Sequence, residues 1–201
     1  MKLINTKELS LIIVLAVVHF VMIFFIGQTA RMITGIPGAS YFFTIFHAII
    51  TSFSLLIYKG KRWRFFFQMV LLTFLIIPTY IGGIPFDLLS KTNLIVVAFI
   101  VDLVFNSLYN SFNRTQKLIF WSVLASVTFW LLNPLFGIFI KSILLFPPDY
   151  IERLIGVIST IFPVIIIEAI IGGWIGYKIF LRTSNEKLQM TKKSTVTTTS
   201  K

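Results

Sequence analysis

Long apolar segments follow one another along this chain, and only short polar or basic turns separate them. A bilayer core is about 30 Å thick, and an α-helix needs about 20 apolar residues to cross it. The chain is 57% hydrophobic and only 12% charged, and its mean hydropathy is +0.92. A soluble domain needs a more polar surface than this. The sequence therefore predicts an all-α, polytopic membrane protein.

Six of these segments are predicted to be transmembrane helices that pack as one bundle. They cover residues 8–26, 41–58, 63–77, 92–109, 117–132 and 151–181. No convincing cleavage site follows the first segment, so we expect a retained helix rather than a signal peptide. Residues 1–182 are predicted to form one six-helix domain. Residues 183–201 are rich in Ser, Thr and Lys and are predicted to form a disordered cytoplasmic tail.

Prolines interrupt the last two segments. Asn133-Pro134 predicts a break or kink, and the apolar stretch 135–146 after it is too short to cross a bilayer alone. That stretch fits a re-entrant helix, an interfacial helix or a tilted continuation of the helix before it. Pro163 predicts a kink in the last helix.

Basic residues are distributed unevenly over the predicted turns. With six helices and the N-terminus inside, 14 of the 18 Lys and Arg residues lie on the inner side; the other four are Arg31, Lys91, Lys141 and Arg153. The positive-inside rule then predicts that both termini are cytoplasmic, as in a multi-pass protein of the plasma membrane. The net charge of +11 favours contact with the anionic lipid bilayer over nucleic acid binding, because no single basic patch forms.

Four ionisable residues stand out because they lie away from the ends of predicted helices, where a charge costs about 2.5–3.5 kcal/mol. They are His19, His47, Asp102 and Glu168. Asp102 shares a helix face with Asn106. Each carboxylate has two interpretations: it contacts a ligand or couples to a proton, or it bonds a neighbouring helix as a structural group.

The two histidines have a similar pair of interpretations. His19 has only apolar neighbours and is expected to be packed and hydrogen-bonded. His47 shares a polar stripe with Thr44, Thr51 and Ser54, which lines a cavity or bonds back to the helix. No pair of potential ligands has metal-site spacing on one helix, so no metal site is predicted.

Several motifs for chemistry are missing from the sequence. It has no cysteine, no Walker A motif, no Gly-x-Ser-x-Gly and no His-Glu-x-x-His. We therefore predict no cofactor and no enzyme activity in this chain. The pair Gly172 and Gly176 permits close helix approach, and packing inside the bundle is favoured over dimerisation.

A further set of motifs resembles the arrangement found in one known family of membrane proteins. They are Thr6-Lys7-Glu8-Leu9 before the first helix, the Ile36-Pro37-Gly38 turn, the basic turn Tyr58-Lys59-Gly60-Lys61, Asp102, and Glu168-Ala169-Ile170-Ile171-Gly172-Gly173-Trp174-Ile175-Gly176-Tyr177 before a basic tail. In this arrangement, residues 5–182 resemble the S components of energy-coupling factor (ECF) transporters, which are substrate-binding membrane subunits.

The resemblance implies capture of a vitamin or a similar small molecule. It also implies partners, namely a transmembrane coupling subunit and two ATPase subunits, and transport by toppling of the bundle. The pocket would lie near the outer face, and aromatic and polar groups there suit a small organic ligand. The predicted substrate-binding residues are Arg31, Asp102, Asn106, Trp130, Asn133 and Glu168.

Two other functions fit the same residues. One is an intramembrane enzyme that uses Asp102, Glu168 or a histidine as acid or base. The other is a structural or assembly protein without a ligand.

Overall fold

The computed structural model describes residues 4–34, 39–81, 85–144 and 146–198. Within these ranges, the structure does not describe the side chains of residues beyond 184, nor those of Gln28, Ala30, Arg31, Thr34, Ala39, Ser40 and Ser90. The predicted Ile36-Pro37-Gly38 turn lies outside the described residues.

All secondary structure in the described ranges is helical, as predicted. The α-helices are α1 (Thr6–Met22), α2 (Thr29–Thr34), α3 (Thr44–Tyr58), α4 (Arg64–Ile76), α5 (Asn93–Arg114), α6 (Leu118–Ile143) and α7 (Pro148–Thr198). A π-helical turn over Ile23–Gln28 joins α1 to α2, and short 3-10 turns over Ala39–Phe43 and Leu89–Lys91 precede α3 and α5.

Five helical stretches in the described residues are long and apolar enough to cross a membrane. They are Thr6–Gly27, Tyr41–Tyr58, Asn93–Arg114, Leu118–Ile143 and Pro148–Ser184. α4 is apolar but shorter, with 13 residues. At 1.5 Å per residue it is about 20 Å long, which is less than the hydrocarbon thickness. Its ends therefore need partners for their backbone groups.

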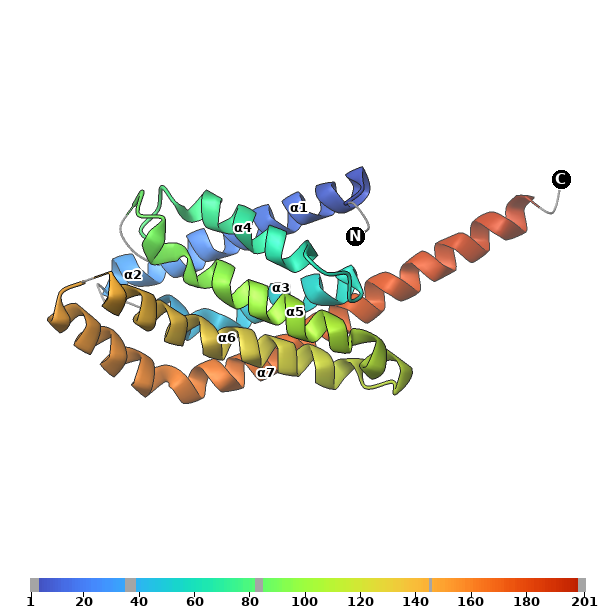
Figure 1. Cartoon of the computed structure of the whole chain (residues 1–201). Helices are drawn as coiled ribbons and strands as arrows, with labels where there is room; N and C mark the ends of the chain where they lie inside the picture. Colours follow the sequence, from blue (N-terminus) through green and yellow to red (C-terminus); the bar gives the residue numbers. More distant parts are fainter. Residues whose placement is uncertain (1–3, 35–38, 82–84, 145, 199–201) are drawn as a thin grey trace.

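The helices pack as a bundle in which neighbours form a closed ring. In order around the ring, α1 contacts α4, then come α5, α6, α7 and α3, which contacts α1 again. α3 also contacts α6 and so lies toward the centre. Figure 1 shows α7 running beyond the bundle toward the C-terminus.

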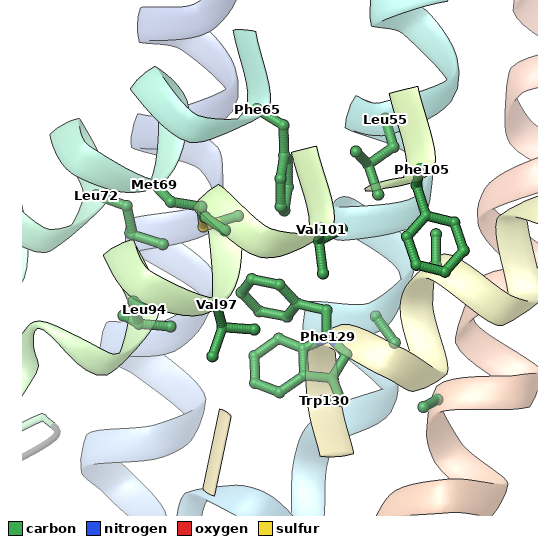
Figure 2. Close-up of a cluster of buried hydrophobic side chains, with 14 of the residues drawn as sticks. Leu55, Phe65, Met69, Leu72, Leu94, Val97, Val101, Phe105, Phe129 and Trp130 are labelled. Carbon is green, nitrogen blue, oxygen red and sulfur yellow. The ribbon is translucent and has the colours of Figure 1, made fainter. Parts of the chain in front are cut away.

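The buried apolar core includes residues of α1, α3, α4, α5, α6 and α7, and part of it lies where α4, α5 and α6 meet. α4 contributes Phe65 and Met69, α5 contributes Val101, and α6 contributes Phe129 and Trp130 (Figure 2). The Phe65 and Phe129 rings meet edge to face with centroids 5.5 Å apart. Such pairs add to the stabilisation that comes from apolar burial, so α4 is well anchored despite its length.

Glycines let α7 approach two neighbours closely. A Cβ atom added to Gly172 would lie 2.5 Å from the Ala48 Cβ atom and 2.7 Å from the Ile45 carbonyl oxygen. A Cβ atom on Gly173 would lie 2.9 Å from the Val123 Cα atom of α6. The Gly172–Gly176 pair thus packs inside the bundle against α3, as the sequence favours.

Several predicted boundaries were wrong. Residues 29–34 are helical rather than loop. α5 continues beyond 109 to Arg114, because polar residues can extend a helix past the end of its apolar segment. α6 runs through Pro134 to Ile143, so the stretch after Pro134 is a continuation of the same helix. α5 and α7 pack along α6, and such packing lets a helix tolerate a proline.

The C-terminal segment is described as the end of α7, which reaches Thr198. It extends away from the other helices in Figure 1. A polar helix that packs against no other element has only marginal stability in water. The disordered tail from residue 183 therefore stays a prediction.

The close packing of α7 predicts the effect of one added methyl group. Gly172→Ala should lower the free energy of unfolding by about 1–3 kcal/mol, because the Cβ atom meets α3 backbone that cannot move freely. Gly156→Ala is the matched control: no atom lies within 4 Å of its added Cβ atom, and alanine favours the helix. Reversible unfolding in mixed micelles measures both. Equal stability of the two variants would contradict the packing described here.

Candidate binding site

Asp102, the first predicted site residue, caps a neighbouring helix. Its side chain lies on α5 and is 2% exposed. The Trp63 N–H donates to Oδ1 (3.0 Å) and the Phe66 N–H donates to Oδ2 (2.8 Å). The Asn106 amide donates to the same Oδ1 and to the Lys61 carbonyl oxygen (3.4 Å). Asp102 and Asn106 together therefore hold the turn before α4.

The physical reason is the unpaired start of α4. The first N–H groups of a helix have no partner within the helix, and Trp63 provides no side-chain cap. Trp63 also has a positive φ of 73°, a strained conformation for a non-glycine residue. A carboxylate at this position satisfies two N–H groups and complements the positive end of the helix dipole.

Lys91 performs the complementary task at the other end of α4. It is 0% exposed. Its Nζ donates to the carbonyl oxygens of Ile76 (2.8 Å), Ile77 (2.8 Å) and Thr79 (2.6 Å). A buried ammonium group surrounded by carbonyl oxygens complements the negative end of the helix dipole. The sequence predicts an outer turn at Lys91 and no structural role for it.

Asp102 and Lys91 together fix the direction of α4. Eleven positions separate them along the chain, which is about 17 Å of rise in a helix, close to the length of α4. Since Asp102 meets the start of α4 and Lys91 meets its end, α4 runs antiparallel to α5. Both ends of this short helix thus receive partners from one neighbouring segment.

Glu168, which lies on α7, caps the start of α3 in the way that Asp102 caps the start of α4. The Ile45 N–H donates to Glu168 Oε2 (3.1 Å), and the Thr44 N–H also bonds this carboxylate. These groups form the first turn of α3. For both carboxylates, the structure matches the interpretation of a group that bonds a neighbouring helix. Asp102 and Glu168 serve different helices, so they do not form one site.

A different group of polar side chains meets in the bundle interior. The imidazole rings of His19 (α1) and His47 (α3) stack with centroids 5.6 Å apart, and the His47 ring lies 5.4 Å from the Trp130 ring of α6. All three residues are at most 4% exposed. The sequence suggested a packed, hydrogen-bonded His19, but the ring is packed without a bond in the described residues.

Hydrogen-bonding atoms in this group lack partners. Among the described residues, no partner bonds His19 Nδ1 and Nε2, His47 Nδ1 or Trp130 Nε1. Two nearby hydroxyls also lack a hydrogen-bond partner among the described residues: those of Thr51, one turn from His47, and of Ser126, one turn from Trp130. A buried polar group without a partner costs about 1–3 kcal/mol. We call His19, His47 and Trp130 the His–Trp cluster.

Asn133 lies one turn beyond Trp130 on α6 and joins a second polar contact. The Asn93 amide donates to Asn133 Oδ1 (2.7 Å), and Asn133 Nδ2 lies 3.5 Å from the Tyr41 hydroxyl. Lys141 is buried nearby, since a Cβ atom on Gly137 would lie 3.4 Å from Asn93 Nδ2 and 4.0 Å from Lys141 Nζ. Of the predicted site residues, the structure thus brings Trp130 and Asn133 to one region. The Arg31 side chain lies outside the described ones.

The side chains of this region are of the types found in small-molecule sites rather than in metal sites. It combines aromatic faces with donors and acceptors, as ligand sites do. No group of three or more His, Cys, Asp or Glu residues in the described part of the chain could hold a metal ion.

Sequence reasoning missed Asn93 and Lys91. Both stand at the start of α5, where an asparagine and a lysine are ordinary turn residues. Lys91 stands between Ser90 and Thr92 in the sequence, so its neighbours give no indication of burial.

Comparisons with known proteins give no relative: no protein family, no curated protein and no solved structure matches this chain.

The caps on α4 predict large losses from small changes. Lys91→Met should lower the free energy of unfolding by about 1–3 kcal/mol, because it removes the ammonium donor from the Thr79 carbonyl oxygen and one of the donors to the Ile76 and Ile77 carbonyl oxygens. Lys117→Met removes an exposed lysine at the start of α6 and should cost less than about 0.5 kcal/mol. Unfolding in mixed micelles gives both values. A small loss for Lys91→Met would show that water or lipid replaces the ammonium group.

Proposed function

We propose that this chain is the substrate-binding membrane subunit of an ECF-type importer, and that it captures a vitamin-like small molecule. One observation carries the proposal: buried donors and acceptors of the His–Trp cluster lack partners within the described residues. Buried polar groups in native proteins are almost always paired, with protein, water or a ligand. A bound molecule would supply the missing partners.

The proposed topology has six spans with both termini in the cytoplasm, in the plasma membrane. α4 supplies the sixth span beside the five long stretches, since its antiparallel contact with α5 returns the chain to the opposite side. Lys and Arg are concentrated on the side that holds the start of α1 and the α3–α4 turn, which supports that side as cytoplasmic. The His–Trp cluster then lies in the outer half, near the end of α1 and the start of α3.

The positions of the carboxylates favour capture over intramembrane catalysis. An acid–base site would need Asp102 or Glu168 within reach of a histidine and a substrate. Both accept hydrogen bonds from helix N-termini instead. We therefore assign substrate contacts to Trp130, Asn133 and the two histidines, and helix capping to Asp102, Asn106 and Glu168.

In this proposal the chain supplies binding and its partners supply energy. The sequence has no Walker A motif, which agrees with the use of two separate ATPase subunits and a coupling subunit. A structural or assembly protein is the alternative, and it differs by having no bound small molecule.

The test is whether the purified protein retains a ligand. Mass spectrometry of an extract from the full chain should identify one small organic molecule near one equivalent per protein. Trp130→Phe keeps an aromatic side chain but removes the N–H donor, so it should weaken retention about fivefold, the loss of one hydrogen bond worth about 1 kcal/mol. Trp174→Phe is the matched control, because Trp174 is 47% exposed on α7.

Three results would contradict the proposal. The first is an empty protein that copurifies without coupling or ATPase subunits. The second is an equal loss in the two tryptophan variants. The third is a ligand retained unchanged by Trp130→Phe.

A further inference from the structure

A hollow of about 230 Å³ lies where α1 begins and α3 turns into α4. It is far from the His–Trp cluster, which lies near the end of α1. Its lining includes Lys7, Glu8, Leu11, Ile57, Lys61 and Arg64. The function proposed above makes no use of this hollow.

The hollow carries an excess of positive charge. Three basic side chains line it, and Glu8 is its acidic residue. Glu8 bonds both Lys61 (2.5 Å) and Arg64 (2.9 Å), so one carboxylate faces two cations. Lys7 is exposed and has no ion-pair partner among the described residues. The local charge therefore favours an anionic ligand.

Arg64 adds a buried donor that is not satisfied. The residue is 6% exposed. Its Nη1 donates to the Arg62 carbonyl oxygen (2.9 Å) and its Nη2 to Glu8, while Nε has no partner in the described part of the chain. A buried guanidinium N–H without an acceptor is costly, and a phosphate oxygen is a preferred partner for it.

The apolar part of the lining narrows the class of anion. Leu11 and Ile57 are half-buried in the hollow. In a bilayer an apolar surface faces acyl chains. A ligand that fits both parts has a phosphate group joined to a hydrocarbon chain.

We propose that this hollow binds the phosphate group of an anionic phospholipid, with Lys7, Lys61 and Arg64 around the phosphate and Leu11 and Ile57 beside the acyl chain. In the proposed orientation the lipid comes from the inner leaflet, whose surface is anionic. A free phosphate ion shares the polar chemistry but makes no use of the apolar side.

The experiment uses the full chain in detergent and compares three additives: dioleoyl phosphatidylglycerol, dioleoyl phosphatidylcholine and inorganic phosphate. Native mass spectrometry counts bound lipid, and thermal unfolding gives apparent affinity. Phosphatidylglycerol should bind near one equivalent and raise the Tm, and the other two should have little effect. Lys7→Gln should weaken phosphatidylglycerol binding about fivefold, since one cation near an anionic lipid is removed.

The matched control is Lys117→Gln, which removes an exposed lysine from the α5–α6 turn, outside the lining of the hollow. It should leave phosphatidylglycerol binding within twofold. Equal losses in the two variants, or no loss in Lys7→Gln, would overturn the proposal. Equal binding of phosphatidylcholine would overturn the requirement for an anionic headgroup. Stabilisation by inorganic phosphate to the same extent would assign the site to a free ion instead of a lipid.

Discussion

The structure depends on how the ends of α4 are satisfied. No water is available inside a bilayer to bond a free backbone N–H or carbonyl group, so a helix that ends there needs partners from protein. α4 has 13 residues and is shorter than the apolar layer. Asp102 bonds two N–H groups at its start, and Lys91 bonds three carbonyl oxygens at its end. α4 contacts both α1 and α5, so the ring of helices is closed only when α4 is in place.

This constraint changes how the charged residues of the bundle are interpreted. A buried carboxylate in a membrane protein invites a functional role. Here Asp102 and Glu168 both bond the first turns of neighbouring helices, so the scaffold accounts for them. Among the buried polar groups that have no partner in the described residues are the imidazoles and the indole of the His–Trp cluster. The functional proposal rests on these groups for that reason, and it leaves the carboxylates with the fold.

The sequence predicts the parts of this structure that local pattern controls. Apolar runs predict the helices, and α4 differs from its predicted range by one residue at each end. Long-range partners are beyond such patterns: Glu168 meets Ile45, which is 123 positions away, and Lys91 turns inward to α4 from a position typical of a loop. The continuity of α6 through Pro134 was also open, since packing from α5 and α7 decides it. At the candidate site, the sequence indicates Trp130 and Asn133, but it does not predict the hydrogen bond of Asn133 with Asn93 or the stacking of His19 on His47.

Amide hydrogen exchange at the start of α4 tests the central claim most directly. The account predicts that the Trp63 and Phe66 N–H groups are strongly protected in the native protein and exchange much faster in Asp102→Asn, which keeps the shape of the side chain but only one acceptor oxygen. The corresponding amide of Ile45, which Glu168 bonds, should be unchanged in that variant. Equal protection of Trp63 and Phe66 in the native protein and the variant would contradict the account, because α4 would then not depend on the carboxylate of α5.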